Sequence, residues 1–334
     1  MDRNVPYISH IVALIGLWAI GAGEAQTVPE KLIEAGHWKR ARTIVEARIH
    51  DDPRDAMANF LLSQIRNAFG DRESPQALAE RAVAIDGGTA KYRRQLAEVL
   101  GVKAQHSGIF QQLVLARRFK KEIDAAIALD SHDLQALRDL MEFYLLAPGI
   151  AGGDKAKART IAEQIVRIDP VEGFSAQARL AEVNGDHNQV EGLLCRAVEA
   201  APPNYRARIA LSNFYALSGR SNLERAEQHA REAAQIDPGR VEAYAILAQI
   251  YAARGRWGDL DSVLATAERE VPDDLVPAYR AGETILASGR DIDRAVRCFR
   301  KYLTSEPEGN APTRSDAQRK LVLALEKLGA RHHE

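Results

Sequence analysis

Proline residues recur along the chain at nearly constant spacing, and this recurrence limits the fold more than any other feature of the sequence. The members of the series are IHDDP (49–53), RIDP (167–170), Pro202, QIDP (235–238), Pro272 and Pro307. Pro202 and Pro238 lie 36 residues apart, and Pro238 and Pro272 lie 34 apart. Such a period indicates a stack of small structural units rather than two or three separate compact domains.

The segment from Val241 to Asp274 shows what one period contains. Its apolar residues recur at helical spacing in two stretches, namely Tyr244, Leu247, Ala248 and Tyr251, then Trp257, Leu260, Leu264 and Ala267. Gly255 separates the stretches, where a residue able to adopt a positive φ favours the end of a helix. Pro272 follows the second stretch, where a helix cannot continue. The segment therefore predicts two antiparallel helices, and small residues at their contact let them approach closely.

This pattern resembles the tetratricopeptide repeat family, whose unit is 34 residues folded as a helical hairpin. Eight units follow one another: 22–55, 56–89, 90–133, 134–170, 171–204, 205–240, 241–274 and 275–309. The third is ten residues longer than the usual unit, and a single helix over 314–329 is expected to cap the stack. The resemblance implies an all-α, helical-hairpin solenoid wound as a right-handed superhelix, with the first helices lining its concave face. We expect residues 26–334 to form one such domain.

The first 25 residues predict a signal peptide. Arg3 gives a weakly positive start, residues 11–22 form an apolar run, and Gly23-Glu24-Ala25 places small residues where a signal peptidase cleaves. The run is short for a spanning helix, which needs about 20 residues. We expect cleavage after Ala25 and export, with no membrane insertion of the remainder; an uncleaved anchor is the alternative. Two cysteines in an exported chain are compatible with a bacterial periplasm.

Composition and motifs predict neither a nucleic-acid partner nor an active site. The 45 basic and 46 acidic residues leave a formal net charge of -1, without the excess of positive charge that nucleic acid attracts. The nine histidines do not have metal-ligand spacing. Cys195 and Cys298 fall on second helices three repeats apart, which predicts two free, largely buried thiols. We therefore expect no catalytic residue, no metal and no cofactor.

The stretch LLAPGIAGGDKAKA (145–158) is the sharpest candidate for chemistry, because it places glycines and a lysine before a helix. A phosphate-binding loop requires GxxxxGK followed by serine or threonine, after a strand. Here the lysine does not follow a glycine, no serine or threonine comes next, and the preceding segment has helical periodicity. We predict a lengthened turn instead, with Asp154 capping the next helix and Lys155 facing water.

The densest basic run is RRFKK (117–121), in the enlarged third unit. On a helix, Phe119 and Ile123 would turn inward and the charges would lie on the solvent side. A solvated face is the expectation, and an acidic partner segment or phospholipid headgroups are the alternatives.

The family resemblance implies that a partner binds along the first helices. The expected binding residues are Arg138, Glu142, Arg179, Arg206, Asn213, Gln249, Arg280 and Glu283. This set is polar and mixed in sign, which suits an extended peptide or a short helix. Chaperone-binding members of the family carry lysine and asparagine one helical turn apart, whereas here Ile209 precedes Asn213. That departure argues against a cytosolic chaperone adaptor.

The sequence thus predicts a non-enzymatic protein-protein interaction scaffold of the bacterial cell envelope, which binds a protein or peptide partner along a concave groove. The alternative is a periplasmic accessory component of a transport or envelope-assembly system. The partner's identity and the oligomeric state are left open.

Overall fold

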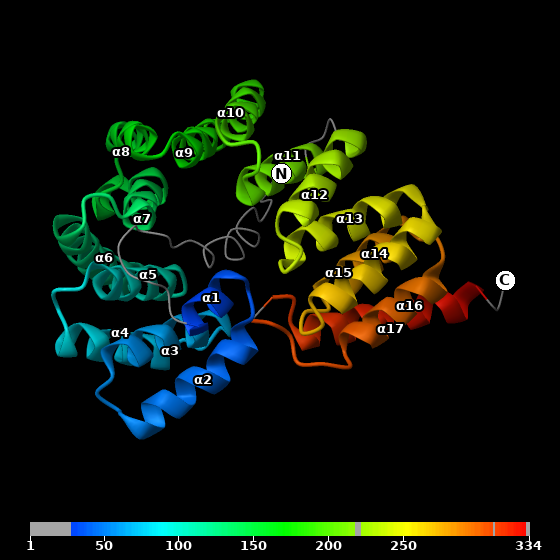
Figure 1. Ribbon diagram of the computed structural model, residues 1–334, viewed down its shortest axis with the longest axis horizontal. Coiled ribbons are helices and arrows are strands. Elements are labelled where there is room, and N and C mark those ends of the chain that lie inside the picture. The colour runs from blue at the N-terminus through cyan, green and yellow to red at the C-terminus, as the bar shows by residue number, and fades with distance from the viewer. Residues whose placement is uncertain (1–27, 218–221, 310, 332–334) are drawn as a thin grey trace. The chain divides into compact units, whose positions relative to one another are not determined.

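The computed structural model describes residues 28–217, 222–309 and 311–331 (Figure 1). Within these residues the chain forms seventeen α-helices and one short 3-10 helix, and no strand. The chain divides into two compact units, the N-terminal unit up to Asp139 and the C-terminal unit from Leu140. The predicted signal peptide lies outside the described residues.

The N-terminal unit consists of helical hairpins. Its helices are α1 (Val28–Glu34), α2 (Trp38–Asp51), α3 (Ala56–Ala68), α4 (Ser74–Ile85), α5 (Ala90–Gln105), α6 (Ile109–Leu129) and the first part of α7 (Leu134–Leu146). From α1 to α6, each helix packs against the next one along the chain, and α3 also contacts the other first helices α1 and α5. Leu61 and Ile65 of α3 are completely buried, as is Val45 of α2.

The C-terminal unit continues with the end of α7 and repeats the arrangement. Its further helices are η2 (Gly149–Ala151), α8 (Lys155–Ile168), α9 (Pro170–Val183), α10 (His187–Ala200), α11 (Tyr205–Leu217), α12 (Leu223–Ile236), α13 (Val241–Arg254), α14 (Trp257–Glu270), α15 (Val276–Ser288), α16 (Ile292–Tyr302) and α17 (Arg314–Arg331). The last helix, α17, packs against α16 and α15 and buries Ala317 and Ala324 completely. It thereby covers apolar surface at the end of the stack.

The α13–α14 hairpin forms as its sequence predicts. Gly255 ends α13 in the left-handed conformation, with a φ of +68°. Tyr244, Ala248 and Tyr251 are each at most 4% exposed, because α13 is covered by α12, α14 and α15. The prediction of an all-α chain of helical hairpins is confirmed.

Hydrogen bonds and ion pairs fix the register between adjacent hairpins. The Tyr205 hydroxyl of α11 donates to Glu242 of α13 at 2.8 Å and accepts from the Ala243 amide at 3.3 Å. Glu227 of α12 is only 6% exposed and accepts from Arg256, ahead of α14, at 2.8 Å. Arg231 lies 2.6 Å from the same carboxylate. Arg231 belongs to α12 itself, so the contacts that join helices about one repeat apart are those of Tyr205 and Arg256.

The enlarged third unit owes its size to two long helices. The helix α5 has 16 residues and α6 has 21, joined by the short turn His106–Gly108. Phe119 and Ile123 point inward, as predicted, and are 7% and 0% exposed. Arg94 of α5, in the same unit, is buried, and its Nε donates to Asp133 at 3.0 Å.

Candidate functional site

The glycine loop before α8 is a turn in which the four amides from Ala151 to Asp154 are engaged within the chain. The Ala151 and Gly153 amides donate to the Pro148 carbonyl at 2.8 and 3.1 Å, and the Asp154 amide donates to the Tyr144 carbonyl at 2.7 Å. The Asp154 carboxylate caps α8 by accepting from the Ala156 and Lys157 amides. Those hydrogen bonds lower the pKa of Asp154. A phosphate needs free amides, so the predicted turn, with Asp154 as its cap and Lys155 exposed, is confirmed.

The predicted binding residues lie on first helices, and five of them share one register. Arg138 belongs to the N-terminal unit and the other seven to the C-terminal unit. Counted from the first residue of each repeat, the ninth position holds Glu142, Arg179, Asn213, Gln249 and Glu283. We call these five residues the position-nine row.

Ion pairs occupy both ends of the position-nine row. Arg179 donates to Glu142 of the preceding first helix at 2.9 Å and to Glu182 at 2.7 Å. Burial lowers the pKa of Arg179, but these two carboxylates outweigh burial and raise it. At the other end, Glu283 pairs with Arg280 at 3.0 Å and with Lys320 of α17.

The remaining charged members of the predicted set also have partners within the chain. Arg206 of α11 lies 3.8 Å from Glu172 of α9. Arg138 donates to Gln135 at 2.6 Å. Burial raises the pKa of Glu283, but Lys320 and Arg280 together have the larger effect and lower that pKa below its ordinary value. Arg179 and Arg206 therefore pair with carboxylates of the preceding first helix, whereas Arg138 and Arg280 contact residues of their own helix.

The middle of the row is different, because its two residues carry amide side chains rather than charges. Asn213 and Gln249 are half-buried, and neither side chain hydrogen-bonds to another described residue. Their helices, α11 and α13, pack against each other. Each amide offers two donors and a carbonyl acceptor, which are the groups that an extended peptide backbone can satisfy. One turn earlier lie the apolar residues Ile209 and Ala245, which give the site non-polar surroundings.

The first helices of the N-terminal unit bring together a cluster of polar side chains that the sequence interpretation missed. Asn67 of α3 donates to Glu98 of α5 at 3.1 Å, and Gln135 donates to Asp139 of α7 at 2.8 Å. The second carboxylate oxygen of Asp139 is buried and accepts no hydrogen bond within the described part of the chain. The repeat register could have indicated Glu98, which is also the ninth residue of its unit.

Burial makes both carboxyl groups of this pair hard to ionise. It raises the pKa of Glu98 to about 8, and the neighbouring Asp139 adds to the shift while Arg94 and Asn67 oppose it. Burial likewise raises the pKa of Asp139 to about 7, against the effect of Arg94, Arg138 and Gln135. Near neutral pH the pair holds a proton that two free carboxyl groups would lose.

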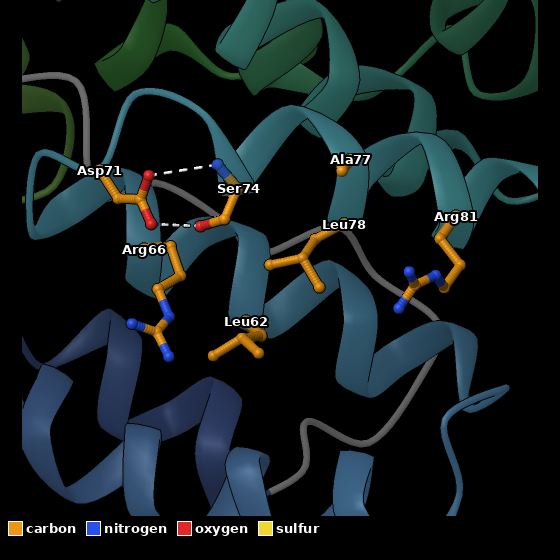
Figure 2. A pocket seen from close by; sticks show the side chains of 7 residues that line it. All are labelled: Leu62, Arg66, Asp71, Ser74, Ala77, Leu78 and Arg81. Carbon is orange, nitrogen blue, oxygen red and sulfur yellow. Dashed lines mark hydrogen bonds between the residues drawn. The ribbon is translucent and has the colours of Figure 1, made fainter.

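A shallow cavity of about 460 Å³ lies at the α3–α4 hairpin (Figure 2). Leu62 and Leu78 lie between Arg66 on one side and Arg81 on the other, as Figure 2 shows. Arg66 pairs with Glu46 at 2.9 Å. Asp71 accepts hydrogen bonds from Ser74, whose hydroxyl lowers the pKa of Asp71. Most polar groups of the cavity are thus paired with one another or with Glu46.

Neither a metal centre nor a disulfide is found in the part of the chain that the structure describes. No cluster of three or more histidine, cysteine or acidic side chains there could hold a metal ion. Both cysteines are free, with Cys298 buried and Cys195 half-buried. Burial raises the pKa of Cys298 to about 11, so this thiol is unreactive at neutral pH. None of the described helices combines the length and the apolar character needed to cross a membrane.

Comparison with known proteins identifies the fold through solved structures alone. No protein-family model and no curated protein matches the sequence. The crystal structure of yeast Tom70 aligns with 94% of this chain and 67% of its own, at 12% identity and a TM-score of 0.59. A tetratricopeptide repeat protein from Parabacteroides merdae aligns with 81% of this chain and 98% of its own, at 14% identity and a TM-score of 0.43. A TPR protein of Thermus thermophilus aligns with 63% of this chain and 99% of its own, at 17% identity and a TM-score of 0.42.

The similarity to Tom70 establishes the fold class. The chain is an all-α, tetratricopeptide-type solenoid of helical hairpins.

Proposed function

We propose that the chain is a non-enzymatic scaffold that binds an extended segment of a protein partner along the first helices of its C-terminal unit. The observation that carries this proposal is a pair of half-buried amides, Asn213 and Gln249, that lie at equivalent positions of packed helices and hydrogen-bond to no other described residue. Neither amide is among the buried polar atoms that lack a partner, so both still reach water and are accessible to a ligand. A peptide backbone that crosses both helices would hydrogen-bond to both amides.

The charges that flank these amides have a different role. Arg179 with Glu142, and Glu283 with Lys320, hold adjacent first helices together at both ends of the row. They set the positions of the amides and leave the partner's backbone as the group that is recognised. Binding through backbone hydrogen bonds tolerates varied side chains, as expected of a scaffold.

A double variant, Asn213→Ala with Gln249→Ala, tests the proposal. We expect it to lower the affinity for the partner about tenfold or more, because each lost hydrogen bond contributes about 1 kcal/mol. The partner would be captured by in-cell cross-linking with wild-type protein, identified by mass spectrometry, and then titrated against each purified variant.

The matched control is Gln189→Ala with Gln235→Ala, which removes two exposed amides from the second helices α10 and α12. This control should bind like wild type. If the double variant binds as tightly as the control, the amides are not the site. If Arg206→Glu with Arg280→Glu instead abolishes binding while the fold is retained, the charges are the anchors.

We also propose that the scaffold acts in the bacterial cell envelope, since the first 25 residues carry the features of a signal peptide. The intact mass of the protein purified from the periplasmic fraction should correspond to a chain that starts near Gln26. A full-length mass in that fraction would favour the uncleaved anchor, and recovery only from the cytosol would refute export.

A further inference from the structure

The first turns of α6 expose apolar side chains that the core does not use. Phe110 is 84% exposed, Ile109 64% and Val114 57%. The side of α6 that packs against the core consists of other residues further along the helix, namely Leu115, Phe119, Ile123 and Ala126, which are buried. Contiguous apolar side chains of this kind on a surface mark an interaction site.

Basic residues lie on the same side of α6 as the exposed apolar residues, further along the helix. Phe110, Val114, Arg117 and Lys121 follow one another at intervals of four, three and four residues, which places them on one outward stripe. We call these four residues the outer stripe. Arg117 and Lys121 are exposed, and neither forms an ion pair with another described residue.

The other charges of α6 are engaged. Arg118 pairs with Glu80 at 2.8 Å, and Glu122 pairs with Arg93 at 2.9 Å. Lys120 pairs with Asp124 on its own helix. The positive charge available on the outer stripe is therefore that of Arg117 and Lys121, next to the apolar end.

We propose that the N-terminal end of α6 docks on an anionic lipid surface. At about 1.5 Å per residue, Arg117 lies about 4 to 5 Å and Lys121 about 10 Å beyond Val114 along the helix axis. The headgroup layer on each side of a bilayer is about 5 to 8 Å thick. With the helix end pointing into the membrane, Phe110 and Val114 would reach the acyl boundary and Arg117 would lie among the phosphates. Lys121 would lie just outside the headgroup layer, where the negative surface potential still attracts it.

A protein partner fits this surface less well. A stable protein interface buries about 800 Å² on each side, from about 20 residues or more. The exposed apolar side chains here come from the end of one helix. A lipid surface does not require a large binding surface of matching shape, because it deforms around the inserted side chains and attracts each nearby cation independently.

Phe110→Trp in the full chain reports directly on insertion. We expect its emission, after subtraction of the wild-type spectrum, to shift to the blue and to be quenched by brominated lipids. The vesicles would be phosphatidylcholine mixed with phosphatidylglycerol. The effect should vanish on pure phosphatidylcholine and weaken with added salt. Ala128→Trp, on the same side near the other end of α6, is the positional control and should show neither change.

Charge reversal tests the role of the cations. Arg117→Glu with Lys121→Glu, in the Phe110→Trp background, should weaken vesicle binding by at least about tenfold. Arg54→Glu with Arg72→Glu changes the net charge equally at two other exposed sites of the same unit and should leave binding unchanged. The proposal is overturned if the emission of the Phe110→Trp variant does not respond to vesicles, or if neutral vesicles act equally. It is also overturned if an acidic protein, but no vesicle, protects the introduced indole from a soluble quencher.

Discussion

Gly173→Ala is expected to destabilise the protein by about 3 kcal/mol, although alanine is the better helix former by about 1 kcal/mol. Gly173 lies in the first turn of α9, where the chain leaves α8 through a turn of a single residue, Asp169. A Cβ atom at Gly173 would lie 2.3 Å from the Cα and 2.6 Å from the backbone nitrogen of Val166. Because those atoms belong to the α8 backbone, no side-chain rotation relieves the clash, and the two helices must separate.

Gly192→Ala is the matched control for this prediction. Gly192 lies in α10, is exposed, and has no atom within 4 Å of its Cβ position. The same substitution there should stabilise the protein by up to about 1 kcal/mol through helix propensity. Urea unfolding followed by circular dichroism measures both variants. A Gly173→Ala protein as stable as wild type would mean that α8 and α9 do not approach as closely as the structure shows.

The hairpins could be predicted because the signals that define them are local. The apolar spacing of Tyr244, Ala248 and Tyr251 selects the buried side of α13, and Gly255 ends the helix within its own sequence. Asp154 likewise caps the helix that follows it directly. These interactions span a few residues, so a repeat period and turn chemistry suffice to locate them.

The details of the site depend on contacts between repeats, which the sequence does not display. Arg179 and Glu142 are 37 residues apart, and nothing in either segment indicates that they pair. The sequence therefore identified polar first-helix residues, but could not distinguish the charges that hold adjacent helices from the two amides that hydrogen-bond to no other described residue. Gly173 illustrates the same limit, because an isolated glycine in a helix looks unfavourable until Val166 is seen beside it.

The Glu98–Asp139 pair was missed for a related reason. Each carboxylate alone looks like an ordinary surface residue of an amphipathic helix. Only the packing of the first helices of the N-terminal unit brings them together beside Asn67 and Arg94 and removes most of their water. Their altered acidity is a property of the fold, and it has a measurable consequence.

Glu98→Gln is expected to make the protein more stable than wild type in alkaline solution, and more stable by a smaller margin in weak acid. The ordinary pKa of a glutamate is 4.5, and burial in the fold raises that of Glu98 to about 8. Below the lower value the group is protonated in both the folded and the unfolded chain. As the pH rises towards the higher value, the unfolded chain releases the proton that the folded chain retains. The free energy of unfolding therefore falls across this window.

The size of this loss of stability depends on how far the pKa of Glu98 is raised and on how much solvent still reaches its carboxyl group. Each pKa unit corresponds to about 1.4 kcal/mol. Because Glu98 is half-buried rather than sealed from water, we expect a loss of about 2 kcal/mol, less than the shift alone would give. Glutamine has nearly the same shape and can still accept the hydrogen bond from Asn67. It removes the titration without opening a cavity.

Urea unfolding at about pH 5.5 and about pH 8.5 measures the effect as the difference between variant and wild type at each pH. Glu80→Gln is the matched control in the same unit. Hydrogen bonds from Gln76 and Arg118 keep the pKa of Glu80 below its ordinary value, so it is ionised in both states across this range. Its difference from wild type should not change with pH. If the difference for Glu98→Gln is equally constant, Glu98 ionises as a solvated carboxyl and its raised pKa is refuted.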